Sequence, residues 1–236
     1  MSDSYVVRSM PVDQAVPQER AVFIRKTYAH LAGAVAAFIG VEYLLFQTSL
    51  AGVMIKFMGS SRYGWLAILG GFTIAGWLAR GFAASGRTQT QQYFGLGLYV
   101  VAEAVIFLPL LYIARYYSGP EVISSAALIT GLLFTGLTAV VFFTKKDFSF
   151  IGSILTIGGF VAVGLIVASI IFNFTLGVIF SGAMVILAGG AILFETSKIM
   201  KTYSTDQYVA ASLQLFASVA LMFWYVLRIL MRFSKR

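Results

Sequence analysis

Seven long apolar segments separated by short polar breaks are the dominant feature of this 236-residue sequence. A helix that crosses the hydrocarbon core of a bilayer needs about 20 residues, and each segment has a suitable length. The alternating ten-residue pattern of a membrane barrel does not occur. The sequence therefore predicts an all-α integral membrane protein, folded as one bundle of seven transmembrane helices. The expected spans are 28–46, 63–84, 91–113, 121–143, 148–172, 176–197 and 207–231.

The composition narrows the chemistry that the chain can perform. Charged residues make up 11% of the sequence, against about 25% in soluble domains. Cysteine is absent and His30 is the only histidine, which excludes disulfides, thiolate metal sites, cysteine nucleophiles and histidine clusters. No HExxH, GxSxG or P-loop motif occurs. We therefore expect a protein that is not an enzyme and that holds no cofactor.

The chain divides into one membrane domain with a polar segment at each end. The expected parts are an N-terminal tail at 1–27, a membrane domain at 28–231 and a basic C-terminal tail at 232–236. Pro11 and Pro17 disfavour a continuous helix in the N-terminal tail. This tail is either disordered without a role or the segment that engages a soluble partner. The charged residues available for such a contact include Arg8, Asp13, Glu19 and Arg20.

The distribution of Lys and Arg predicts the orientation of the chain. Cytoplasmic loops carry an excess of these residues, and most loop Lys and Arg lie on the side of the N-terminus, which we therefore place in the cytoplasm. The net charge of +8 then reflects membrane topology, and we expect no nucleic acid partner. Seven spans put the basic C-terminal end on the outer side, against the same rule. Either that end tolerates the outer face or one segment is re-entrant; we expect seven full spans.

Four charged side chains within the expected spans are candidates for a function, because a charge at the bilayer centre costs at least ~2.5 kcal/mol. Glu103 lies near the middle of the third segment and is expected to be protonated, paired or facing a wet cavity. Glu42 lies in the outer half of the first span, near enough to the interface to be solvated. Arg80, near the inner end of the second span, can extend to the headgroups. Glu195 has two alternatives: an exposed pair with Lys198 one turn away, or an interior pair with Arg80.

Three sequence blocks carry a resemblance to a known family. The blocks are KKDFSFIGSIL at 145–155, GAILFETSKI at 190–199 and YVAASLQLF at 208–216. They resemble the Bax inhibitor-1 (TMBIM) family, most closely its bacterial YccA branch. The resemblance implies a seven-helix bundle whose last helix is enclosed by the other six. It also implies a bacterial inner membrane location, in contact with membrane lipid.

The resemblance further implies a site for a transported ion. Some bacterial members of the family act as pH-sensitive calcium leaks that use two acids and one arginine. Glu195 corresponds to the first acid and Arg80 to the arginine, while Ser218 occupies the position of the second acid. Calcium commonly takes several carboxylate oxygens as ligands, and this chain lacks one carboxylate of the pair. Either Glu103 replaces it, or this branch does not conduct calcium.

Two functions are therefore expected as alternatives. The YccA likeness implies a partner and modulator of the membrane protease FtsH, which would grip the N-terminal tail, in membrane protein quality control and stress protection. The alternative is a pH-sensitive leak through Glu195, Arg80 and Glu103, with Ca2+ or protons as the transported species. The missing second acid favours the first function. A structural membrane protein with neither activity is the remaining alternative.

Overall fold

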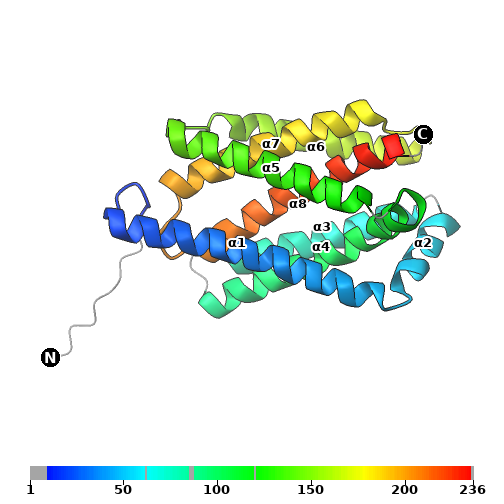
Figure 1. The fold of residues 1–236 in the computed structure, drawn as a ribbon, viewed down its shortest axis with the longest axis horizontal. Coiled ribbons are helices and arrows are strands. Elements are labelled where there is room, and N and C mark those ends of the chain that lie inside the picture. The colour runs from blue at the N-terminus through cyan, green and yellow to red at the C-terminus, as the bar shows by residue number, and fades with distance from the viewer. Residues whose placement is uncertain (1–9, 62, 85–87, 120, 235–236) are drawn as a thin grey trace.

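A computed structural model describes residues 10–61, 63–84, 88–119 and 121–234. Within these residues the chain forms eight α-helices and no strand, and seven of the helices are long and apolar enough to cross a membrane. The predicted bundle of seven membrane-spanning helices is therefore confirmed (Figure 1). The seven are α1 (Pro17–Phe46), α3 (Gly64–Ala83), α4 (Gln89–Tyr117), α5 (Glu121–Thr144), α6 (Ile151–Ile171), α7 (Val178–Lys201) and α8 (Tyr208–Ser234).

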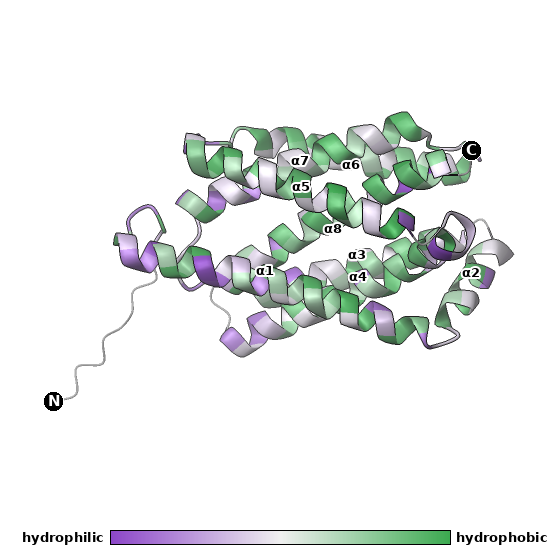
Figure 2. Ribbon diagram, viewed as in Figure 1, coloured by the Kyte–Doolittle hydropathy of each residue, from purple (hydrophilic) through white to green (hydrophobic). Residues whose placement is uncertain are grey.

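The long helices run between two ends of the bundle. We call the end at which α1 begins the N-terminal face, and the end at which α8 finishes the C-terminal face. Most hydrophilic residues gather toward these two ends (Figure 2). Each of the seven helices has at least 20 residues, and α1 begins at the opposite end of the bundle from the end of α8 (Figure 1). The helix lengths therefore favour seven full spans over a re-entrant segment.

A short eighth helix, α2 (Leu50–Ser60), follows α1 at the C-terminal face (Figure 1). It was not expected from the sequence, because a helix of 11 residues is too short to cross a bilayer. It packs against α1, α3 and α4. Ala51 and Met54 on its inner side form a small buried cluster with Leu108 of α4. The helix therefore covers one end of the bundle.

Both ends of the expected membrane domain are longer than the sequence indicated. α1 begins at Pro17, where the prediction placed the start at 28. Proline is tolerated in the first helical turn because the missing N–H has no intrahelical partner there, so Pro17 starts the helix that it was expected to disfavour. Phe23, within the expected tail, is buried in the core. At the other end α8 continues through Arg232 to Ser234, so the basic C-terminal tail begins as helix.

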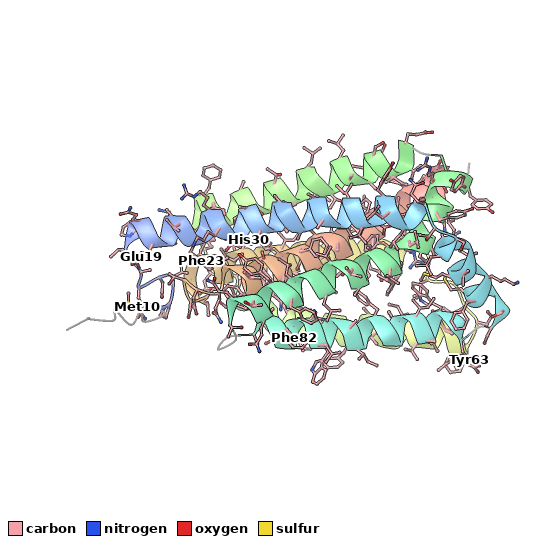
Figure 3. The ribbon with its side chains drawn as sticks, turned by 90° about the horizontal axis from the view of Figure 1, so that it is seen from below. Met10, Glu19, Phe23, His30, Tyr63 and Phe82 are labelled. Carbon is pink, nitrogen blue, oxygen red and sulfur yellow. The ribbon has the colours of Figure 1, made fainter. Side chains whose placement is uncertain are left out.

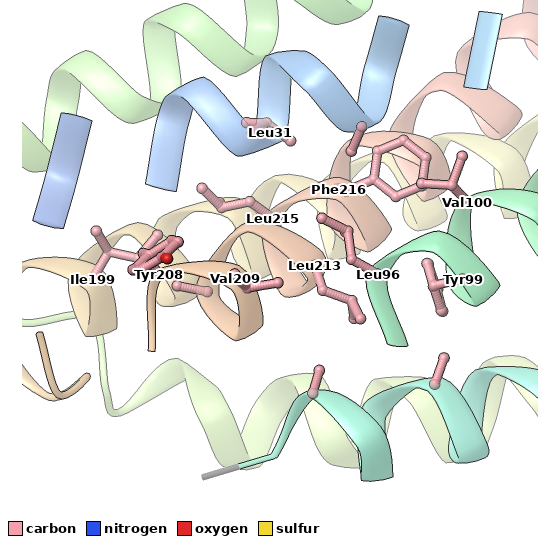
Figure 4. Close-up of a cluster of buried hydrophobic side chains, with 14 of the residues drawn as sticks. Leu31, Leu96, Tyr99, Val100, Ile199, Tyr208, Val209, Leu213, Leu215 and Phe216 are labelled. Carbon is pink, nitrogen blue, oxygen red and sulfur yellow. The ribbon is translucent and has the colours of Figure 1, made fainter. Parts of the chain in front are cut away.

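α8 is central, as the family resemblance implies, and five of the other six long helices make most of its contacts. It packs against α1, α3, α4, α5 and α7. Figure 4 shows Leu213, Leu215 and Phe216 of α8 between Leu31 of α1 and the side chains of α4. α6 packs mainly on the outside of α7, and Ala162 is its one buried side chain in the described chain. The even apolarity of α6 suits lipid contact on most of its surface.

Two of the sequence blocks that carry the family resemblance pack against each other at the N-terminal face. The backbone N–H of Phe148 donates to Ser197 Oγ at 3.1 Å, and Lys201 Nζ lies 3.6 Å from Asp147 Oδ2. A Cβ added at Gly152 would lie 2.9 Å from the ring of Phe194, so glycine allows α6 to approach α7 closely here. These contacts fix the start of α6 against the end of α7.

Candidate functional site

A large cavity of about 1260 Å³ lies among α3, α4, α6, α7 and α8. Most of its wall is apolar, with polar groups concentrated at a few positions. All four site residues expected from the sequence line it: Arg80, Glu103, Glu195 and Ser218. They come from four different helices, so the fold brings together residues that are far apart in the chain. The structure describes the positions of these residues; their roles stay predictions.

Glu103 is paired inside the cavity, as one of its expected alternatives required. It is 5% exposed, and a side-chain hydrogen bond joins it to Tyr99, one turn earlier on α4. The guanidinium carbon of Arg80 lies 5.6 Å from the centroid of the Tyr99 ring, and its charge acts on Glu103. Arg80 reaches this position because α3 packs closely on α4. A Cβ at Gly95 would lie 2.5 Å from the Ala79 carbonyl oxygen.

Glu195 has different partners, and the expected interior pair with Arg80 is wrong. Its carboxylate lies 3.3 Å from Lys198 Nζ and accepts a hydrogen bond of 3.0 Å from the Tyr203 hydroxyl. The alternative pair with Lys198 is confirmed, although the Glu195 side chain is only 12% exposed. Burial raises the pKa of Tyr203 well above its usual value, and the Glu195 carboxylate raises this pKa further. Tyr203 therefore stays protonated and keeps donating to Glu195.

Ser218 lies buried on α8 and lines the cavity at mid-helix. Its hydroxyl donates to the backbone oxygen of Gln214 at 3.1 Å. At the position where the family resemblance places a second acid, this chain therefore presents a small neutral group bonded to its own helix. Within the described residues, no three His, Cys, Asp or Glu side chains lie close enough together to hold a metal ion.

Glu42 lies outside the cavity, and its expected solvation at the outer interface is wrong. It is 6% exposed, and neither carboxylate oxygen has a hydrogen-bond partner in the described part of the chain. The sequence placed Glu42 near a helix end, where water is usually within reach. α2, which was not expected from the sequence, packs beside this end of α1. Proximity to a helix end was therefore a poor guide to exposure.

The N-terminal residues form a strap that the sequence did not reveal. We call residues 10–16 the strap; it lies along the connection between α7 and α8. The Val12 N–H donates to the backbone carbonyl oxygen of Tyr203 at 2.9 Å, and the Thr205 N–H donates to the carbonyl oxygen of Met10 at 3.2 Å. Val12 is fully buried, and Figure 3 shows Met10 at the same end of the bundle as Glu19. The strap therefore holds the backbone of the residue that binds Glu195.

The charged tail residues proposed for partner contact are distributed unevenly. Arg8 lies outside the described residues. Asp13 and Glu19 are exposed, and Arg20 is half-buried at the first turns of α1. Between them, Val12 anchors the strap in the core. A single valine in a polar tail gives no periodic signal, so sequence reasoning had no means of finding this anchor.

Sequence reasoning also missed two arginines at the other end of the cavity. Arg228 and Arg232 lie one turn apart on α8, and both line the cavity. The sequence placed Arg228 near the end of the seventh span and Arg232 at the start of the basic C-terminal tail. Arg228 packs 5.8 Å from the centroid of the Tyr225 ring, and in the described chain no ion pair involves either arginine. Their four-residue spacing on a helix was the signal that could have revealed them.

Comparison with known proteins identifies the family. The family model described as inhibitor of apoptosis-promoting Bax1 matches residues 20–235. The chain belongs to the Bax inhibitor-1 family. The match begins within the first turn of α1 and extends through α8, so it includes nearly all of the seven long helices.

Relatives of this Bax inhibitor-1 family member occur in bacteria and yeast. An uncharacterized protein of Pseudomonas aeruginosa is 30% identical over 92% of this chain and 93% of its own length. Bax inhibitor 1 of Schizosaccharomyces pombe is 28% identical over 93% of this chain and 80% of its own length. The modulator of FtsH protease YccA of Escherichia coli is 36% identical over 47% of this chain and half of its own length. The two latter names describe an inhibitor and a modulator.

Proposed function

We propose that this protein is a bacterial inner membrane partner that modulates the protease FtsH. Similarity to YccA, which is named for that activity, supports the proposal. The structural observation that carries it is the strap, because a protease that grips the N-terminus must first detach Val12 and two backbone hydrogen bonds. The next element to be extracted is α1, a 30-residue helix. Slow extraction keeps the protease occupied and reduces its turnover of other membrane proteins.

The basic residues support the orientation that this proposal requires. FtsH action from the cytoplasm needs the N-terminal face on that side. Lys145, Lys146, Lys198 and Lys201 all lie at this face, at the ends of α5 and α7. The excess of Lys and Arg in cytoplasmic loops supports the same placement. A cysteine-labelling experiment on single-cysteine variants tests this placement directly, because the native chain has no cysteine.

The test of the strap uses Val12→Asp in cells that contain FtsH. A buried carboxylate is strongly unfavourable, so the strap detaches and the half-life of the protein shortens several-fold. Gln14→Asp is the matched control, because it adds the same charge two residues away at an exposed position. The degradation of a reporter substrate of FtsH is followed in parallel. It should be faster in cells with Val12→Asp than in cells with the wild-type protein. Equal half-lives of the two variants, or no dependence on FtsH, contradict the proposal.

A second candidate function is a pH-sensitive leak of calcium or protons. It is favoured by the observation that Arg80, Glu103, Glu195 and Ser218 all line one cavity. Flux is measured in liposomes that contain the purified protein, between about pH 6 and 8, the range of a burial-raised carboxyl. Glu103→Gln and Glu195→Gln should abolish the pH dependence. Glu19→Gln, an exposed acid outside the cavity, should leave it unchanged.

The two functions respond differently to loss of the tail. Deletion of residues 1–16 removes the strap but none of the cavity-lining residues. A protease modulator loses capture by FtsH, whereas a leak keeps its flux. Absence of flux from the wild-type protein across this pH range removes the second candidate.

A further inference from the structure

The cavity has a side that no helix closes. α3 packs against α2, α4 and α8, while α6 packs against α7, and α3 and α6 are not packed together in the described chain. Both helices nevertheless line the cavity, α3 through Leu69 and Phe72 and α6 through Val163. Val163 is 56% exposed, so the cavity is continuous with the outer surface of the bundle. In a membrane protein that surface meets the acyl chains of lipid.

At the C-terminal end of the cavity, the charged groups of the described chain are two arginines without a neighbouring acid. Arg228 and Arg232 share one side of α8 and both line the cavity. The cavity's acids are held elsewhere, Glu103 by Tyr99 and Arg80 and Glu195 by Lys198 and Tyr203. Two neighbouring guanidinium groups without an acid create a positive potential, and planar guanidinium groups bind phosphate oxygens in bidentate fashion.

The depth of these arginines matches that of lipid headgroups. They lie in the last turns of α8, which ends at Ser234 on the C-terminal face (Figure 1). Trp65 and Trp224 stack with ring centroids 6.0 Å apart, and both line the cavity near this end. Tryptophan is enriched where membrane and water meet. Toward the bundle centre the lining becomes apolar, with residues such as Ala162 and Ile166.

We propose that this part of the cavity binds an anionic phospholipid. Its phosphate lies between Arg228 and Arg232, and an acyl chain enters through the open side and lies between α3 and α6. The volume of about 1260 Å³ exceeds the roughly 300–1,000 Å³ of ordinary small-molecule pockets, so it holds more than a headgroup. The apolar wall favours a lipid over a free phosphate ion.

The first test is lipid retention by the full-length protein. The protein is purified in detergent, titrated with phosphatidylglycerol or with zwitterionic phosphatidylcholine, and analysed by native mass spectrometry. The double variant R228Q/R232Q should lose affinity for phosphatidylglycerol by about tenfold per arginine and should bind phosphatidylcholine as wild type does. The matched control is K56Q/R115Q, which removes two exposed charges from the same face outside the cavity.

The second test fills the acyl-chain part of the cavity. Gly159 of α6 lines the cavity and has open space where a side chain would begin, so Gly159→Leu should weaken phosphatidylglycerol binding. Gly164→Leu is the control, because Gly164 lies on the same helix, is equally open, and does not line the cavity. Neither variant removes a charge, so the test stands even if the arginine variants fold poorly.

The outcomes separate a lipid site from its alternatives. Unchanged phosphatidylglycerol affinity in R228Q/R232Q overturns the proposal, and so does an equal loss in K56Q/R115Q, which indicates a general effect of surface charge. Displacement of the lipid by millimolar inorganic phosphate, together with no effect of Gly159→Leu, identifies a free-anion site and also overturns it. Loss in R228Q/R232Q and Gly159→Leu alone supports it. None of these readouts depends on FtsH or on ion flux.

Discussion

Two regions of one cavity differ in whether their charged side chains have partners within the chain. Glu103 at the middle of α4 and Glu195 toward the N-terminal face each have partners supplied by the chain. Toward the C-terminal face, Arg228 and Arg232 lie together without an ion pair in the described chain. Partnered charges hold a fold in one arrangement, whereas unpartnered charges favour a ligand of opposite sign. Mutations near the two acids should therefore alter stability, whereas mutations of the two arginines should alter binding.

The largest expected effect is at the helix contact that holds Arg80 in place. Gly95→Ala puts a Cβ 2.5 Å from a backbone oxygen of α3, and overpacking of this kind costs about 1–3 kcal/mol. Gly97→Ala on the same helix meets open space and should be neutral or slightly stabilising. Thermal unfolding in detergent, followed by circular dichroism, measures the difference. Equal melting temperatures for the two variants would show that α3 and α4 can move apart at little cost. That result contradicts a role for this contact in stability.

A smaller loss is expected from Tyr99→Phe. The variant removes the phenol that bonds the buried Glu103, and the loss of one intramolecular hydrogen bond costs about 0.5–1.5 kcal/mol. Tyr116→Phe is the control on the same helix, at an exposed position. The same unfolding measurement applies. If Tyr116→Phe loses as much stability as Tyr99→Phe, the hydrogen bond between Tyr99 and Glu103 has no specific role in stability.

At the C-terminal end, Arg232→Gln should change stability by less than about 0.5 kcal/mol in detergent without anionic lipid. No chain partner is lost in the described residues, and repulsion with Arg228 is relieved. Added phosphatidylglycerol should raise the melting temperature of the wild type more than that of the variant, because ligands that bind the folded state stabilise it. A marked destabilisation in the absence of lipid indicates that Arg232 serves the fold.

The smallest effect concerns the loop before α6 and depends on pH. Hydrogen bonds from the Ser149 side chain and backbone lower the pKa of Asp147, and Lys201 lowers it further. The resulting stability is present above the ordinary aspartate pKa of about 3.9 and is lost as the pH falls through the lowered value. Ser149→Ala removes one of these bonds. The stability of this variant should therefore fall less than that of the wild type on acidification below about pH 4. Ser153→Ala, without a bond to Asp147, should follow the wild type.

The sequence by itself determined the membrane class, the seven spans and the family. These follow from signals within single segments: runs of about 20 apolar residues, short polar breaks, and three blocks that resemble the family, such as GAILFETSKI. It also singled out Arg80, Glu103, Glu195 and Ser218, since a polar group inside an apolar segment stands out without any knowledge of its neighbours. All four do line one cavity.

Only the tertiary structure decided which of these groups meet. Arg80 lies with Glu103 instead of Glu195 because the close contact of α3 and α4 sets the rotation of both helices. The strap and α2 gave no spanning signal, yet they cover Tyr203 and one end of α1. The grouping of Arg228 and Arg232 at an open cavity depends on α6 standing away from α3. Hydropathy is a property of each segment alone, whereas pairing depends on which turns of different helices face one another.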